Sequence, residues 1–179
     1  MNITGGIYNR QKITAPDESI TRPTLSKVRM SVFNTLAAII NFNDKSFLDM
    51  YAGSGIMGLE AISRGFKKIT SIEKNKKVYN ITKQNFAKYT QNNDITLIFG
   101  DSLKICKKLE EKFDVIYIDP PYFSGIYEAS LSSIKNIAGG IVILEHITEI
   151  ELPENFVIIK QKKYADKYIT FLEYNKSQE

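Results

Sequence analysis

Short apolar runs alternate along this chain with segments whose apolar residues recur at helical spacing. The apolar runs predict a strand beginning at Ser46 and further strands at 68–73, 95–99, 113–118, 140–145, 155–163 and 168–174. Helical periodicity follows in between, around 56–62, 74–89, 103–111 and 127–136. Alternating strands and helices indicate an α/β protein. We therefore expect a seven-stranded, mostly parallel sheet with an antiparallel C-terminal edge strand.

The first 45 residues do not follow this alternation. Two glycines within 3–13 suggest a small hairpin, and Pro16 and Pro23 interrupt regular structure. Thr24 can cap a helix whose apolar face runs from Val28 to Ile40. We expect an N-terminal extension at 1–45 and a main domain at 46–179, folded together as a single globular unit.

Length and composition limit the possible functions. At 179 residues and 43% hydrophobic, the chain has enough apolar residues for one sizeable core and no room for a separate recognition domain. No apolar segment is suited to span a membrane, and no signal peptide is recognisable, so we expect a cytoplasmic protein. One cysteine and one histidine argue against a disulfide or a zinc cluster, and we expect no metal. Cys106 is expected to pack inward from a helix.

Charge weakly favours a polyanionic partner. The net charge is +4 and the pI is about 9.0. Residues 1–45 hold six basic side chains against three acidic ones. Arg22, Lys27 and Arg29 gather near the start of the predicted first helix, where cations do not complement the helix dipole. The extension could therefore face a nucleic acid, although ordinary solvated charges explain the same pattern equally well.

A glycine-rich turn follows the first sheet strand. Gly53, Gly55 and Gly58 lie between that strand and the next helix, where the backbone can approach a nucleotide-like cofactor. Glu73 ends the following strand and could bind both hydroxyls of a ribose. These features suit NAD and S-adenosylmethionine (SAM) equally. Asp49 favours SAM, because its carboxylate would attract a cationic sulfonium and amino group but repel a pyrophosphate.

The fourth strand ends in Asp119-Pro120-Pro121-Tyr122. A carboxylate here could accept one N–H of a nucleobase amino group, and a carbonyl of the stiff Pro-Pro segment could accept the other. Tyr122 offers a ring on which the base could stack. Asp101, after the third strand, could accept from an adenine amino group. Polar or glycine residues at four successive strand ends thus predict methylation of a nucleobase nitrogen.

These motifs resemble those of bacterial methyltransferases that modify N2 of guanine 966 in 16S ribosomal RNA. The likeness includes Gly5-Gly6, Arg22-Pro23-Thr24, Phe33-Asn34 and the motifs around Asp49 and Asp119. It implies a Rossmann-like class I methyltransferase. The implied cofactor residues for SAM are Asp49, Tyr51, Gly53, Gly55, Glu73, Asp101 and Ser102. The implied catalytic residues are Asp119, Pro120, Pro121 and Tyr122.

The same resemblance implies a substrate. RNA contacts would come from Arg10, Arg22, Thr24, Arg29 and Asn34. The family commonly has Gly-Arg where this chain has Arg10-Gln11, so the hairpin contact is displaced by one residue or lost. The expected partner is 16S ribosomal RNA in an assembled or assembling small subunit, and the protein is expected to act as a monomer. We expect specificity to come from the shape around an exposed base.

Three alternatives stay open at this point. An adenine-N6 methyltransferase acting on RNA or DNA would use the same Asp119 motif. A nicotinamide-dependent dehydrogenase would explain the turn from Gly53 to Gly58 but leave Asp119 to Tyr122 without a task. A non-catalytic RNA-binding module would leave the converging strand ends unexplained. His146, which ends a predicted strand, is a minor catalytic candidate.

Overall fold

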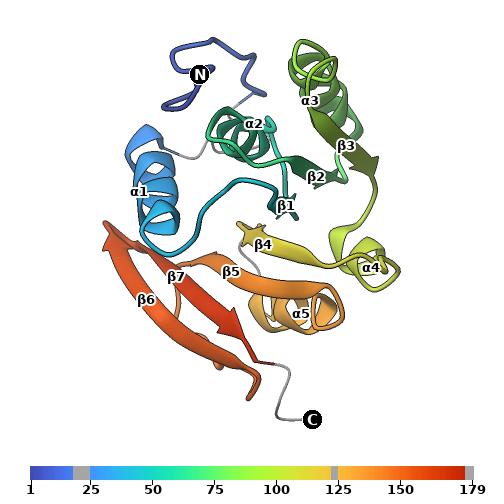
Figure 1. The fold of residues 1–179 in the computed structure, drawn as a ribbon. Helices are drawn as coiled ribbons and strands as arrows, with labels where there is room; N and C mark the ends of the chain where they lie inside the picture. The colour runs from blue at the N-terminus through green and yellow to red at the C-terminus, as the bar shows by residue number, and fades with distance from the viewer. Residues whose placement is uncertain (18–24, 122–124, 176–179) are drawn as a thin grey trace.

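The computed structural model describes residues 1–17, 25–121 and 125–175. Its sheet has the strand order β3-β2-β1-β4-β5-β7-β6 (Figure 1). The strands are β1 (Ser46–Asp49), β2 (Lys68–Glu73), β3 (Asp94–Phe99), β4 (Phe113–Ile118), β5 (Ala138–His146), β6 (Phe156–Tyr164) and β7 (Lys167–Tyr174). The helices are α1 (Ser26–Ala37), α2 (Ile56–Ser63), α3 (Lys76–Ala87), α4 (Ser102–Cys106) and α5 (Ile126–Ser133). The predicted seven-stranded α/β sheet is confirmed.

Helices cover both faces of the sheet. Figure 1 shows α1, α2 and α3 on one face and α4 and α5 on the other. Alternate residues of each central strand supply the two hydrophobic cores: Phe47 and Val115 pack beneath α1 and α2, whereas Leu48 and Ile116 pack against the α4 and α5 side. Cys106 is buried in the second core, as expected. Burial on both faces explains why these strands are almost entirely apolar.

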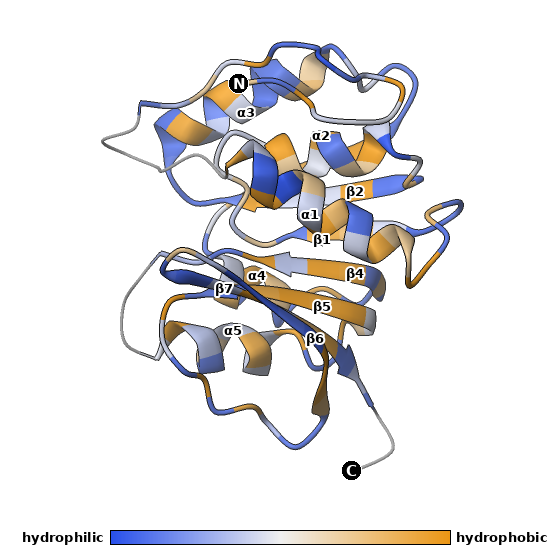
Figure 2. Cartoon of the chain, turned by 90° about the vertical axis from the view of Figure 1, so that its left-hand side faces the viewer, coloured by the Kyte–Doolittle hydropathy of each residue, from blue (hydrophilic) through white to orange (hydrophobic). Residues whose placement is uncertain are grey.

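The first five strands of the sheet, in the spatial order β3-β2-β1-β4-β5, are parallel and end at the same edge. The antiparallel C-terminal edge comes from β7, which pairs with β5 on one side and with β6 on the other. Val157, Ile158 and Ile159 of β6 are each partly exposed, and the hydropathy colouring of Figure 2 shows that polar residues fill much of the rest of this outer strand. The β6–β7 hairpin reverses at Ala165, which has a φ of 54°.

The N-terminal extension shares the main core. A bridge between Asn2 and Lys12 closes a small antiparallel turn, consistent with the predicted hairpin. Ile3 and Ile13 from this turn are buried in the core with residues of α1 and α2. The N-terminal turn is thus packed onto the core, and the division of the chain at residue 45 stays a prediction. Whether it faces RNA stays a prediction.

Element bounds differ from the sequence prediction chiefly at helix ends. Helix α3 begins at Lys76 because the side chain of Asn75 accepts hydrogen bonds from the amides of Lys77 and Val78. Helix α4 ends at Cys106 instead of continuing to 111. Helix α1 begins at Ser26, and the predicted capping residue, Thr24, lies outside the described residues.

Candidate active site

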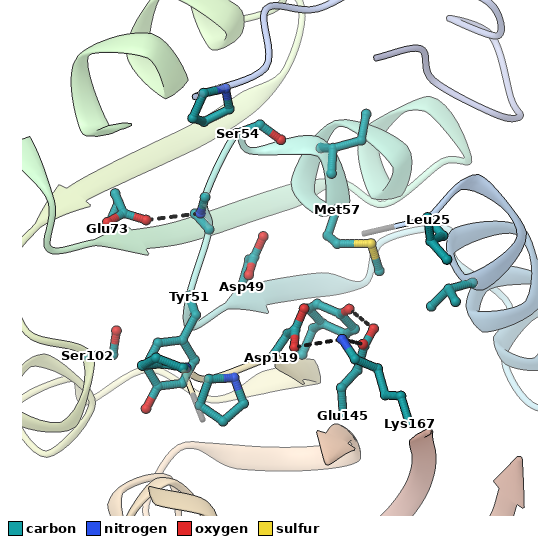
Figure 3. A pocket seen from close by; sticks show the side chains of 18 of the residues that line it. Leu25, Asp49, Tyr51, Ser54, Met57, Glu73, Ser102, Asp119, Glu145 and Lys167 are labelled. Carbon is teal, nitrogen blue, oxygen red and sulfur yellow. Dashed lines mark hydrogen bonds and ion pairs between the residues drawn. The ribbon is translucent and has the colours of Figure 1, made fainter. Parts of the chain in front are cut away.

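A cavity of about 1110 Å³ opens at the carboxyl edge of the parallel strands. Its walls combine the ends of β1, β2, β4 and β5 with the β6–β7 hairpin and the start of α1, and Figure 3 shows these side chains converging. The charged residues that line it are Asp49, Glu73, Lys74, Asp119, Glu145, Asp166 and Lys167. Topology therefore brings together the strand ends that carried the sequence motifs.

Asp49 is the most unusual group in this cavity. Its side chain is 1% exposed, and neither carboxylate oxygen has a hydrogen-bond partner in the described part of the chain. Burial raises the pKa of Asp49 to about 8. The negative charges of Asp119, Glu73 and Glu145 also raise this pKa, whereas the backbone of Tyr51 lowers it. A buried carboxyl group without a partner is costly in the free protein. A cationic ligand would relieve that cost.

The glycine turn and Glu73 form the neighbouring wall. One oxygen of Glu73 accepts the amide of Gly53 at 3.0 Å, and the other accepts the amide of Asn75 at 2.7 Å. Burial raises the pKa of Glu73, and these amides act in the opposite direction. Each carboxylate oxygen retains a lone pair, so Glu73 can still accept from ribose hydroxyls.

Gly55 is required by the geometry of the turn. Its φ is 81°, and a Cβ atom there would lie 2.5 Å from a ring carbon of Phe86. Gly58 is different, because it lies inside α2 and a Cβ atom would lie 2.9 Å from a methyl carbon of Ile69 on β2. Gly58 thus allows the helix to approach the sheet closely, whereas Gly55 shapes the turn that borders the cavity.

Asp119 lies at the end of β4, beside an ion-pair cluster. Oδ1 of Asp119 is 3.2 Å from Nζ of Lys167, and the same Nζ is 2.5 Å from Oε2 of Glu145. The hydroxyl of Tyr117 donates to the other oxygen of Glu145. Burial, followed by repulsion from Glu145, raises the pKa of Asp119 to about 7, and Lys167 acts in the opposite direction. Pro120 and Pro121 also line the cavity.

The remaining predicted cofactor residues divide into two groups. Tyr51 and Ser102 line the cavity. The Tyr51 hydroxyl is 2.8 Å from that of Ser130, and burial raises the pKa of Tyr51 to about 12. Ser102 donates to the carbonyl of Met50. Asp101 is exposed, is not among the residues lining the cavity, and accepts the amide of Lys104 as the cap of α4. Its proposed contact with adenine is untested.

The expected RNA contact by Arg29 is wrong for this structure. Arg29 is 1% exposed, and its guanidinium donates to the carboxylate of Glu60, the carbonyl of Asn2 and the hydroxyl of Ser26. Arg29 can be buried because its charge is paired with that of Glu60, whose side chain is also fully buried. Arg29 therefore stabilises the packing of the extension.

The other RNA candidates have different outcomes. Arg10, with a φ of 67°, and Asn34 are exposed, so both stay available as predicted contacts. Arg22 and Thr24 lie outside the described residues, as does the predicted stacking residue Tyr122.

His146 is held by its neighbours. Nδ1 is 2.7 Å from the carbonyl of Thr148, and Nε2 is 2.8 Å from the hydroxyl of Thr170. Its ring also stacks on Tyr168. His146 is 2% exposed and is not among the residues lining the cavity, which favours a structural role.

Sequence reasoning missed Lys167 and Glu145. Glu145 belongs to a predicted strand and could have been recognised as an acidic residue at the carboxyl end of β5. Lys167 lies 48 residues after Asp119 in the sequence, and only the pairing of β7 with β5 brings it to this edge. No local pattern marks a single lysine in a hairpin as part of a site.

Comparisons with known proteins agree with this architecture. A family model described as Conserved hypothetical protein 95 matches residues 1–173. The chain belongs to that family. Ribosomal RNA small subunit methyltransferase D of Haemophilus influenzae is 30% identical over 171 residues, which cover 90% of this chain and 88% of that protein. The Escherichia coli K12 protein of the same name is 30% identical over 136 residues, covering 76% and 67%. The resemblance inferred from the sequence is confirmed.

Solved structures show the same fold. One from Escherichia coli has a TM-score of 0.87 at 23% identity, with 98% of both chains covered. Magnesium protoporphyrin IX methyltransferase of Synechocystis, solved with bound SAM, has a TM-score of 0.67 at 16% identity, with 83% of this chain and 79% of that one covered. The fold is that of the Rossmann-like class I methyltransferases, and SAM is the cofactor.

The cavity suits that cofactor. Asp49 offers an unpartnered buried carboxylate to a cationic group, and Glu73 retains acceptor capacity for a ribose. These findings favour SAM over the nicotinamide alternative, and a methyltransferase over a non-catalytic module. Among the described residues, no cluster of His, Cys, Asp and Glu could hold a metal ion, and no helix is long and apolar enough to cross a membrane.

Proposed function

We propose that this protein methylates the exocyclic N2 of a guanine in 16S ribosomal RNA, guanine 966, within an assembled or assembling small subunit. One observation carries the chemistry: Asp49, which ends β1, and Asp119, which directly follows the adjacent strand β4, line the same cavity. In this proposal, Asp49 receives the cationic methyl donor and Asp119 receives the target amine. The name of the relatives, ribosomal RNA small subunit methyltransferase D, supports the choice of RNA.

The protein's contribution is mainly alignment and electrostatics. When bound, SAM supplies an electrophilic methyl group on a cationic sulfur. Asp119 accepts one N–H of the guanine amino group, and a carbonyl of Pro120 or Pro121 accepts the other. Holding both hydrogens makes the nitrogen more tetrahedral and aims its lone pair. Asp119 also stabilises the positive charge that develops on the nitrogen and is placed to receive the proton that the methylated amine loses.

The surroundings of the cavity support an RNA substrate. Leu25, at the start of α1, is 70% exposed and lines the cavity, so an unstacked base could meet an apolar surface there. Exposed Arg10 and Asn34 lie on the N-terminal extension. The protein would recognise the shape of a folded particle around an exposed base, acting as a monomer.

Labelled-methyl transfer tests this proposal. The protein and labelled SAM are incubated separately with small subunits, naked 16S RNA and duplex DNA. The small subunits and the 16S RNA come from cells that lack the gene for this protein. We expect transfer to the small subunit, at N2 of guanine 966 when the modified base is mapped. Methylation of adenine N6 would instead favour the adenine-specific alternative, and transfer to duplex DNA alone would overturn an RNA substrate.

A variant separates catalysis from cofactor binding. Asp119→Asn preserves the shape of the side chain but replaces one acceptor oxygen by a donor, so we expect turnover to fall at least about a hundredfold, in the range for loss of a transition-state contact. Affinity for SAM, measured by calorimetry, should change little. Retained turnover in Asp119→Asn would remove Asp119 from the mechanism.

A further inference from the structure

Lys167 is the cation closest to the proposed catalytic carboxylate in the described part of the chain. It lies at the first position of β7 and contacts Asp119 and Glu145 together, as the dashed lines of Figure 3 show. The ammonium lies nearer to Glu145, at 2.5 Å, than to Asp119, at 3.2 Å. Glu145 therefore holds the lysine more closely, and Asp119 receives a longer contact at only one of its oxygens.

Glu145 is itself held in place. Its side chain is fully buried, one oxygen accepts from the Tyr117 hydroxyl, and the other faces Lys167. Three strands thus contribute in turn: Tyr117 from β4 fixes Glu145 on β5, and Glu145 fixes Lys167 on β7. Lys167 contacts Oδ1 of Asp119, so Oδ2 is the oxygen that would accept a substrate N–H.

The charges around Asp119 explain why a cation is needed there. The ionisable groups that face it are Asp49 from β1, Tyr117 from β4, Glu145 from β5 and Lys167 from β7. Glu145 and Asp49 repel a second negative charge, and burial opposes it as well. Only Lys167 favours the ionised form. A protonated Asp119 would carry an O–H donor facing the target amine, which is the wrong polarity for holding its N–H.

We propose that Lys167 is a positioning residue for methyl transfer, which holds Asp119 through one oxygen and keeps it ionised so that the other oxygen can accept the target amine. Glu145 sets the strength of this effect by competing for the same ammonium group. The inference rests on the proposed function of Asp119. It adds to that function a requirement for a lysine on β7 and a dependence on pH. Asp119, with a pKa of about 7, lies where small changes in its neighbours alter its ionisation at neutral pH.

Carboxyl NMR titration of the cofactor-free protein tests the charge relationship without any catalysis. The carbon-13 signal of Asp119 is assigned by its absence in Asp119→Asn. We expect Lys167→Met to raise the pKa of Asp119 by about one unit or more, and Glu145→Gln to lower it by a similar amount, since a unit corresponds to a tenfold change in ionisation. Lys167→Arg keeps the charge and should leave the value within about half a unit.

The acid limb of kcat/KM against pH should shift in the same directions, because it reports the ionisation of the free enzyme. At pH 7, Lys167→Met should lose about fivefold or more in kcat/KM and recover most of that loss at pH 9, with Lys167→Arg retaining most activity. Lys112→Met is the matched control. Lys112 is exposed, precedes β4 at the opposite edge of the sheet, and should shift neither quantity.

Opposite shifts in Lys167→Met and Glu145→Gln support the inference, whereas equal or absent shifts overturn it. If Lys167→Met does not fold, because Glu145 is left buried without its cation, Glu145→Gln decides alone: a lower pKa of Asp119 supports the inference, and an unchanged one overturns it. The titration does not depend on the substrate. If the wild-type protein transfers no methyl group to RNA, the proposed function is overturned. The effect of Lys167 on the pKa of Asp119 is still decided by the titration.

Discussion

The guanidinium Nε of Arg29 on α1 lies 3.2 Å from a carboxylate oxygen of Glu60 on α2, and both side chains are almost completely excluded from solvent. The same carboxylate accepts the amide and the hydroxyl of Thr4 at 2.7 Å, and its other oxygen faces Arg64 at 3.2 Å. Glu60 therefore joins the N-terminal segment, α1 and α2 at one point. The basic character of the extension, which suggested an RNA surface, is partly used inside the protein.

This arrangement predicts a large loss of stability when either buried charge is removed alone. Arg29→Met and Glu60→Gln should each lower the free energy of unfolding by about 3–5 kcal/mol, because the partner charge stays buried. The double variant Arg29→Met with Glu60→Gln should be less destabilised than the two single losses combined. Urea denaturation measures all three. Arg29→Met with normal stability but weakened RNA binding would restore the role that the sequence suggested.

Two glycines with similar backbone angles separate conformational strain from steric crowding. Gly55 has a φ of 81° and Gly125 a φ of 75°, but a Cβ atom at Gly55 would meet Phe86 at 2.5 Å, whereas at Gly125 no described atom lies within 4 Å. Gly125→Ala should cost about 1–2 kcal/mol, the strain of a left-handed residue alone. Gly55→Ala should cost more and weaken SAM binding, because the turn must move.

Thermal unfolding and calorimetric SAM titration of the two variants check this difference. Equal destabilisation, with SAM affinity unchanged in both, would mean that Phe86 yields without moving the turn. Gly58→Ala is a useful third case: its Cβ would be close to Ile69, but its position inside α2 favours alanine, so its cost should fall below that of Gly55→Ala.

The strand ends could be predicted from the sequence because local chemistry marks them. Gly53 and Gly55 follow an apolar run, and Asp119 is followed by two prolines, so each motif carries its own signal of a turn after a strand. Parallel strands then place these ends at one edge. The helix bounds were less predictable, as in α4, where periodicity suggested residues to 111 but the helix ends at Cys106.

Pairings between distant segments could not be predicted in the same way. The partners of Lys167 and of Arg29 depend on which strand follows β5 in the sheet and on how α1 packs over α2. A lysine or arginine has the same local sequence signal whether it meets solvent, RNA or a buried carboxylate. The sequence therefore indicated the strand ends that line the cavity better than the charged groups around Asp119.

His146 should act on stability and not on catalysis. Burial lowers its pKa, and its contacts suit a neutral ring, with Nδ1–H donating to the Thr148 carbonyl and Nε2 accepting from Thr170. Because the folded pKa is below the unfolded one, the stability from His146 is complete above about pH 6.5 and is lost as pH falls. His146→Gln should remove this loss between pH 6.5 and 5 while methyl transfer continues at pH 8. A fall in turnover greater than about tenfold, at unchanged stability, would contradict the structural role.

Asp49 should couple stability, pH and cofactor binding. Its folded pKa, about 8, is above its ordinary value of 3.8, so its favourable contribution is complete at low pH and is lost as pH rises toward 8. Asp49→Asn should remove this loss, which is at most about 1.4 kcal/mol per pH unit. The variant should therefore gain stability relative to the wild type between pH 5 and 8 in the absence of SAM, as thermal unfolding at each pH would show.

Binding a cation reverses that balance, because Asp49 must lose its proton to pair with it. Between pH 6 and 7.5, wild-type affinity for SAM should rise by up to about tenfold per pH unit, and binding should release close to one proton. Calorimetry in two buffers of different ionisation enthalpy measures the proton directly. Asp49→Asn should bind SAM weakly at every pH with little proton release. Proton release equal to that of the wild type would mean that another carboxylate, such as Glu73, supplies the charge that receives the cofactor.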